Sequence, residues 1–186
     1  MLSWDKQFFY FINTSLSHPV LDTIMPTLTD LHKIPALQFF GIPLILVFWF
    51  LKKRRKMIPV LLGLIVAVGA VDLFNYRILK PTFKRPRPPA VEQAINIRTD
   101  RYAGYSFPSN HAANNFAGAT FLSLCYPALS PAFFGFAALV AFSRVYVGVH
   151  YPLDVTIGGL IGWIFGLFFF KIFEIILFRR LYDKKL

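Results

Sequence analysis

The chain has 186 residues, of which 56% are hydrophobic and 16% are charged, and its formal net charge at pH 7 is +11. A soluble domain carries about 25% charged residues, so the composition argues against soluble proteins, including basic nucleic-acid-binding domains. The aromatic content of 18% excludes a disordered basic tail, and a single cysteine, Cys125, excludes a disulfide scaffold. We therefore expect one membrane-embedded domain with no nucleic-acid partner.

Residues 1–33 predict an amphipathic helix that lies in the membrane interface. Apolar side chains recur every four positions from Trp4 to Leu16, which places them on one face of a helix. A histidine–proline pair ends this helix, and a short second segment follows it. Asp22 and Asp30 argue against a membrane span here, although a sixth span remains an open alternative.

Five apolar stretches then predict membrane-spanning helices, so the expected fold class is an all-α transmembrane bundle. About 18–20 apolar residues cross a bilayer core as a helix. Prolines mark the turns that precede the fourth and fifth spans, because proline suits the first turn of a helix but not its interior. The bundle is expected over 34–178, with spans at 34–51, 57–79, 109–126, 131–149 and 152–178.

The distribution of charge predicts the orientation of the bundle. The run 52–56 is entirely basic and the tail 179–186 carries a net positive charge. Five crossings put both on one face, which the positive-inside rule assigns to the cytoplasm. The 80–106 segment then lies on the extracytoplasmic face of the inner membrane, although it carries six basic and two acidic residues. Because the rule disfavours positive charge there, we expect these cations to form an active-site loop.

The first motif runs from Lys80 to Arg87 and is rich in both cations and prolines. The prolines predict a stiff segment without helix over 80–89, which would hold the cations at fixed positions. The planar fork of arginine matches phosphate oxygens, and lysine offers a point charge. Taken alone, the motif also fits a basic cluster that is attracted to anionic lipid head groups.

The second motif opens the third span with Ser109, Asn110 and His111. Serine is a good N-cap, and the free backbone N–H groups that follow it can bind an anion. His111 lies in the first turn and is a candidate general acid. A lone histidine at a membrane boundary also fits a structural role.

The third motif joins the fourth and fifth spans and contains Arg144, His150 and Asp154. An arginine within an apolar run is expected to face the bundle interior. Asp154 lies four residues after His150, where it can accept one imidazole N–H and leave the other nitrogen free to attack. A structural Arg144–Asp154 pair is the alternative. In an alternating five-span bundle, all three motifs lie on one face.

In this order the motifs K-x6-R-P, P-S-x-H and S-R-x5-H-x3-D resemble the phosphatase signature of the type 2 phosphatidic acid phosphatase superfamily, which includes integral-membrane lipid phosphatases. The resemblance implies that His150 is a nucleophile that forms a phosphohistidine. It also implies that Asp154 orients this nucleophile and that His111 protonates the leaving group. The implied phosphate-binding residues are Lys80, Arg87, Ser109, Asn110 and Arg144.

One position departs from the family pattern, because the residue before the motif histidine is usually glycine and is Asn110 here. Glycine permits unusual backbone angles and close approach to phosphate. Asparagine is the next most tolerant residue for positive φ, and it adds a side-chain donor. Cations can stabilise phosphoryl transfer without a metal. The sequence has no carboxylate–histidine cluster typical of a magnesium site, so we expect neither a metal nor a cofactor.

The expected substrate is a membrane lipid with a terminal phosphate or diphosphate. The compact chain resembles the lipid A 1-phosphatase and undecaprenyl diphosphate phosphatase types of this family. We expect lipid A 1-phosphate, with undecaprenyl diphosphate and phosphatidylglycerophosphate as alternatives, and 92–105 is expected to form a rim that selects the head group. A protein that only binds or transports phosphate lipids would need the cations without the nucleophile and the acid. A serine hydrolase built on Ser109 is disfavoured, because the sequence lacks the G-x-S-x-G elbow. The sequence makes no prediction of oligomeric state.

Overall fold

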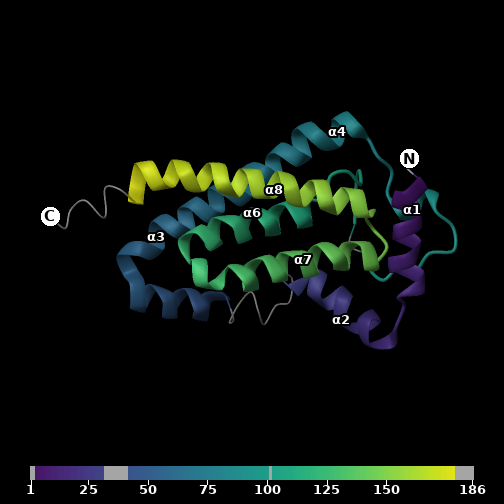
Figure 1. Cartoon of the computed structure of the whole chain (residues 1–186), viewed down its shortest axis with the longest axis horizontal. Helices are drawn as coiled ribbons and strands as arrows, with labels where there is room; N and C mark the ends of the chain where they lie inside the picture. Colours follow the sequence, from purple (N-terminus) through teal and green to yellow (C-terminus); the bar gives the residue numbers. More distant parts are fainter. Residues whose placement is uncertain (1–2, 32–41, 101, 179–186) are drawn as a thin grey trace.

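The structure is a computed structural model that describes residues 3–31, 42–100 and 102–178. These residues form helices and turns with no strand among them, which confirms the predicted all-α class (Figure 1). The start of the span predicted at 34–51 and the tail predicted at 179–186 lie outside the described residues. The longer helices are α1 (Ser3–Tyr10), α2 (Pro19–Thr29), α3 (Ile42–Phe74), α6 (Asn110–Cys125), α7 (Ser130–Tyr146) and α8 (Pro152–Phe173). The shorter ones are η1 (Phe11–Ser15), η4 (Asn75–Leu79), α4 (Lys80–Phe83), α5 (Pro88–Val91), η5 (Pro127–Leu129) and η6 (Glu174–Phe178).

The bundle is built around α6, which α3, α7 and α8 all contact (Figure 1). The α6–α8 contact is very close, because Gly158, Gly162 and Gly166 recur every fourth residue on α8 and face α6. A Cβ atom added to Gly162 would lie 2.1 Å from the carbonyl oxygen of Ala113. Small residues at this spacing let two helix backbones approach each other. The contact therefore fixes where the first turns of α6 and α8 lie relative to each other.

Three of the described helical stretches are long and apolar enough to cross a membrane, namely Ile58–Val91, Pro127–Tyr146 and Pro152–Ile176. They support a membrane-embedded bundle. The predicted total of five spans stays a prediction. The third predicted span corresponds to α6, which has 16 residues. At 1.5 Å per residue it is about 24 Å long, which is shorter than a hydrocarbon core of about 30 Å.

The loop that the sequence predicted at 52–56, between the first two spans, is wrong. Helix α3 continues through 52–56, where the run of positive charges predicted a loop. Lysine and arginine are good helix formers, so their charge alone does not interrupt the helical hydrogen bonds. Figure 1 shows instead that the path of α3 turns at the end of the molecule opposite α1.

The proline-rich segment after α3 contains more helix than the sequence predicted. The short helices α4 and α5 both lie within or overlap 80–89, where helix was expected to be excluded. In each of them proline stands in the first turn, as Pro81 does in α4 and Pro88 in α5. Pro88 follows the extended residue Arg87, so an N–H at its position would have no intrahelical acceptor, whereas Pro81 stands in a helical path that continues from η4 into α4.

Helices α1 and α2 lie against the end of the bundle at which α8 begins (Figure 1). The helical segment that starts with α1 ends before His18, as the histidine–proline pair predicted, and His18 caps α2. Trp4 and Phe8 are 44% and 57% exposed, whereas the next residues along α1, Asp5 and Phe9, are fully buried. An exposed apolar face suits a membrane interface; the interfacial location of α1 stays a prediction.

Candidate active site

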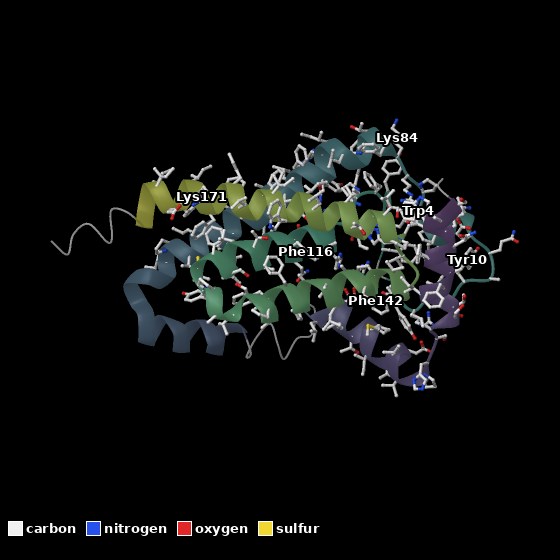
Figure 2. All side chains as sticks on the ribbon, in the orientation of Figure 1. Trp4, Tyr10, Lys84, Phe116, Phe142 and Lys171 are labelled. Carbon is white, nitrogen blue, oxygen red and sulfur yellow. The ribbon has the colours of Figure 1, made fainter. Side chains whose placement is uncertain are left out.

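The three predicted motifs meet at the end of the bundle that α1 and α2 cover. Figure 2 shows nitrogen and oxygen atoms gathered near the labelled Trp4 and Tyr10, whereas carbon dominates around Phe116. The backbone N–H of Arg98 donates to the carbonyl of Val147 over 3.1 Å. The 80–106 segment and the turn after α7 are therefore adjacent, as the alternating bundle predicted.

Lys80 begins α4 and is 8% exposed. Its ammonium donates to the carbonyl oxygens of Tyr105 and Pro108 over 2.8 and 2.9 Å. The side chain therefore points back from the end of the α3–α4 arm to the loop that leads into α6. This places a positive charge next to the start of α6, where a bound anion would also meet backbone N–H groups.

Arg87 lies just before α5 and reaches both the loop before α6 and the turn before α8. Its guanidinium donates to the carbonyls of Ala103 and Gly104 over 2.9 and 3.0 Å, and to the carbonyl of Val149 over 2.9 Å. Its Nη1 also lies 2.9 Å from Nε2 of His150. The predicted nucleophile and the predicted phosphate-binding arginine are thus in direct contact.

Ser109 caps α6 as the sequence predicted, and its hydroxyl accepts from the N–H of Ala112. Its own backbone N–H donates to the carbonyl oxygen of Asp154 over 3.0 Å, which joins the first turns of α6 and α8. This backbone N–H is therefore already occupied. His111 follows in the first turn of α6, so it lies at the same end of the bundle as the other motif residues.

The side chain of Asn110 contacts α3, and its role as a donor for phosphate stays a prediction. Its Nδ2 donates to Asp72 of α3 over 2.8 Å, and Nδ2 of Asn114 donates to the same carboxylate oxygen over 2.9 Å. Asn110 is the first residue of α6 and is not among the described residues with positive φ. The family glycine is therefore replaced without backbone strain, and the amide links α6 to α3.

His150 and Asp154 are buried side by side at the start of α8. Nδ1 of His150 lies 3.4 Å from Oδ2 of Asp154 and 3.5 Å from the hydroxyl of Ser106, at the long end of hydrogen-bond range. The same Oδ2 accepts from the hydroxyl of Ser106 and from the N–H of Tyr151. A guanidinium can only donate, so Nε2 accepts from Arg87. We therefore assign the imidazole proton to Nδ1, which leaves a lone pair on Nε2.

The electrostatic surroundings keep His150 neutral. Burial lowers the pKa of His150 well below its usual value, and the positive charges of Arg87, Arg144 and Lys80 lower it further. Desolvation and nearby cations both disfavour the imidazolium. The ring is therefore in the uncharged form that a nucleophile requires at neutral pH.

Arg144 is 1% exposed near the end of α7, as expected for an arginine that faces the bundle interior. Its Nη1 donates to the hydroxyl of Thr29 on α2 over 2.8 Å, and its Nε is buried without a hydrogen-bond partner among the described residues. Asp154 forms its ion pair with Arg85 instead, so the alternative of a structural Arg144–Asp154 pair is wrong.

Sequence reasoning missed the residues that surround Asp154. Arg85 donates to Oδ1 of Asp154 over 2.6 Å and to Asp5 over 2.5 Å, and Ser106 donates to Oδ2. Arg85 stands in the first motif, where its charge was visible but its partner was not. Neither Asp5 nor Ser106 belongs to a motif, so nothing in the sequence marked them.

The sequence predicts no metal site, and this stays a prediction. Within the described part of the chain, no three His, Cys, Asp or Glu side chains are grouped so that they could hold a metal ion. Lys80, Arg87 and Arg144 instead supply positive charge to the surroundings of His150.

A family profile, curated relatives and a solved structure all relate this chain to lipid phosphatases. The sequence profile of the PAP2 superfamily matches residues 56–176. An undecaprenyl-diphosphatase from Sulfolobus acidocaldarius is 32% identical over 131 residues, which cover 68% of this chain and 61% of that protein. A lipid A 4'-phosphatase from Bacteroides thetaiotaomicron is 32% identical over 114 residues, or 58% of this chain and 51% of that protein. The crystal structure of Aquifex aeolicus LpxE matches with a TM-score of 0.71 at 32% identity, covering 91% of this chain and 96% of that one.

The matches cover only part of this chain and only part of its curated relatives. The chain spans between about half and three fifths of the length of the two curated relatives. The range 56–176 contains every residue of the three motifs, whereas α1 and α2 precede it.

Proposed function

The chain belongs to the PAP2 superfamily, and from this premise we propose that it is a membrane phosphatase that releases the terminal phosphate of a lipid phosphate or diphosphate. The observation that carries the proposal is the contact between His150 and Arg87. Nε2 of His150 carries a lone pair and lies 2.9 Å from a guanidinium nitrogen. A phosphoryl group bound by that guanidinium would be next to the nucleophile.

In the first step, Nε2 of His150 attacks phosphorus and the bond between phosphorus and the lipid oxygen breaks. His111 donates a proton to the leaving oxygen, which becomes a lipid alcohol or, from a diphosphate, a lipid phosphate. The imidazole keeps its proton on Nδ1, where Asp154 stabilises the positive charge that forms on the phosphorylated ring.

In the second step, water attacks the phosphohistidine and the phosphorus–nitrogen bond breaks. His111, now neutral, accepts a proton from the water, and His150 and inorganic phosphate are released. Lys80, Arg87 and Arg144 stabilise the charge on the equatorial oxygens in both steps, because phosphoryl transfer depends mainly on positioning and electrostatic stabilisation. The buried Nε of Arg144 offers a donor for one of these oxygens.

The substrate is proposed at the level of its phosphate. The two curated relatives are named for undecaprenyl diphosphate and for lipid A, which share a terminal phosphoryl group on a membrane lipid. Lipid A 1-phosphate remains the first substrate to test, and 92–105 remains the proposed head-group rim. The site would face the extracytoplasmic side of the inner membrane, because the basic run 52–56 favours the cytoplasmic side.

Phosphate release from purified lipids tests the proposal. The full chain in detergent is incubated with EDTA and lipid A 1-phosphate, undecaprenyl diphosphate, phosphatidylglycerophosphate or phosphatidate. We expect turnover of at least one lipid, and we expect His150→Asn to lower its rate by a factor of about 10³ or more. Vanadate, which mimics pentacoordinate phosphorus, is expected to inhibit.

The matched control is His18→Asn, because His18 caps α2 and asparagine is an effective N-cap. This variant is expected to keep full activity. Activity that survives in His150→Asn contradicts the nucleophile. Activity that EDTA removes and magnesium restores contradicts a metal-independent reaction. Lipid binding without release by the wild-type chain would favour the alternative of a binding or transport protein.

A further inference from the structure

Asp5 is a buried carboxylate on α1, a helix that also carries the exposed apolar residues Trp4 and Phe8. Its side chain is fully buried, and its Oδ1 accepts from the backbone N–H of Leu153 over 2.8 Å. Leu153 lies in the first turn of α8, where N–H groups have no intrahelical acceptor. Asp5 thus caps α8 from a position 148 residues away in the sequence.

The second oxygen of Asp5 binds Arg85, which links it to the candidate active site. Arg85 Nη2 lies 2.5 Å from Oδ2 of Asp5, and Nη1 lies 2.6 Å from Oδ1 of Asp154. The guanidinium also stacks on the ring of Tyr151 at 4.2 Å. One arginine therefore bridges two buried carboxylates, in a geometry that the planar fork of arginine suits.

This bridge divides the two oxygens of Asp154 between two tasks. Oδ1 is held by Arg85, whereas Oδ2 faces His150 and accepts from Ser106 and Tyr151. Because both terminal nitrogens of Arg85 bind carboxylates, Arg85 does not compete with Arg87 for a phosphate. Without Asp5, the guanidinium would be free to rotate, and its hold on Asp154 would change.

We propose that Asp5 and Arg85 are positioning residues that fix Asp154, and through it His150, for the phosphatase reaction. The inference rests on the proposed function and extends it to α1, which lies outside the region that matches the family. The N-terminal helix therefore completes the active site instead of only covering it. A displacement of about 1 Å at a reacting group can lower a rate by about 100-fold, so this support bears directly on turnover.

The variants Asp5→Asn and Arg85→Lys test the proposal on the full chain with a substrate that the wild type hydrolyses. Each is expected to lower kcat by about 10- to 100-fold. We expect KM and inhibition by inorganic phosphate to change less than about twofold, because Lys80, Arg87 and Arg144 are untouched. The double variant is expected to be no slower than Arg85→Lys, since both changes break one bridge.

Lys6→Met is the matched control. Lys6 is the next residue on α1, and it pairs with Glu92 over 2.8 Å without contacting Arg85 or Asp154. It is expected to keep the wild-type kcat. A merely structural anchor predicts equal losses for Asp5→Asn and Lys6→Met, or a higher KM with unchanged kcat, and either result overturns the proposal.

Two further outcomes are decisive. Multiplied losses in the double variant, or an unchanged kcat in Asp5→Asn, also overturn the positioning role. If Asp5→Asn does not yield folded protein by size-exclusion chromatography, Arg85→Lys decides by its kcat and KM, since it keeps the charge. A wild-type chain with no turnover contradicts the proposed function itself, whereas an active wild type with an unchanged Asp5→Asn contradicts only the positioning role.

Discussion

Two regions border the candidate active site, and they are held by different kinds of interaction. The α6–α8 contact is made by small residues whose backbones nearly touch, as at Gly162 against Ala113. The 80–106 segment is held by side chains that donate to carbonyls and carboxylates, as Arg87 does to Val149 and Arg98 does to Asp22. Close packing places the first turns of α6 and α8, whereas polar contacts place the cations.

These two kinds of interaction indicate which substitutions affect the fold and which affect mainly the chemistry. A helix contact without space fails as a unit, because a larger side chain must move a backbone. A hydrogen-bonded loop contains several separate contacts, so the loss of one leaves others in place. We therefore expect substitutions in the α6–α8 contact to act on stability, and substitutions of the phosphate-binding cations Lys80 and Arg87 in the 80–106 segment to act on turnover.

The largest effect is expected from Gly162→Leu, which tests the packed side of the comparison. The new side chain has no space beside the Ala113 carbonyl. We therefore expect the free energy of unfolding to fall by more than about 3 kcal/mol and little folded protein to form. Expression level and thermal unfolding in detergent measure it. Gly135→Leu is the control, because a Cβ atom at Gly135 meets nothing within 4 Å. Equal yields of the two variants would contradict the packing argument.

Arg87→Lys is expected to have the next largest effect, on activity and not on folding. One ammonium cannot reach both the Ala103 carbonyl and Nε2 of His150, which the arginine fork contacts over 2.9 Å each. We expect kcat/KM to fall by about 100-fold with an unchanged unfolding temperature. Lys84→Gln changes an exposed cation of the same segment, which is labelled in Figure 2, and should leave both quantities unchanged. A similar loss in that control would point to general charge rather than to geometry.

Arg98→Gln is expected to have a moderate effect that sharpens the comparison. Arg98 joins the 80–106 segment to α2 through Asp22, to η1 through the carbonyl of Asn13, and to α7 through the carbonyl of Tyr146. Its loss should lower Tm by about 4–8 °C and reduce kcat by only a few-fold, because its side chain contacts the motif through the Tyr146 carbonyl and not through a proposed catalytic or phosphate-binding side chain. Thermal unfolding and phosphate release measure the two effects. A 100-fold loss of kcat with unchanged Tm would contradict a mainly structural role for Arg98.

Lys171→Gln is expected to have the smallest effect and calibrates the others. The Lys171–Glu174 pair spans 2.9 Å at the far end of α8, and its side chains are 60% and 43% exposed. Exposed pairs contribute between about 0 and 1 kcal/mol. We expect Tm to change by less than about 2 °C and phosphate release to stay at the wild-type rate. A larger change in either would show that α8 depends on contacts beyond its packing against α6.

The sequence located the helices near the site well, because their limits depend on local chemistry. Pro152 begins α8 and Ser109 caps α6, as predicted, since proline and serine act within one turn of their own position. The sequence also placed Asp154 one helical turn from His150, and they lie together. It failed at 52–56, where good helix formers outweighed the expectation of a loop.

The sequence was enough to predict the helical class, the family and the candidate residues for phosphate chemistry, because motif order and hydrophobic runs are properties of the chain. Only the tertiary structure decided which of those residues are partners. It paired Asp154 with Arg85, directed Arg144 to Thr29 and Asn110 to Asp72, and brought Asp5 to the start of α8. Partners separated by 38 to 148 residues meet only when helices pack, and no local pattern records which faces will touch.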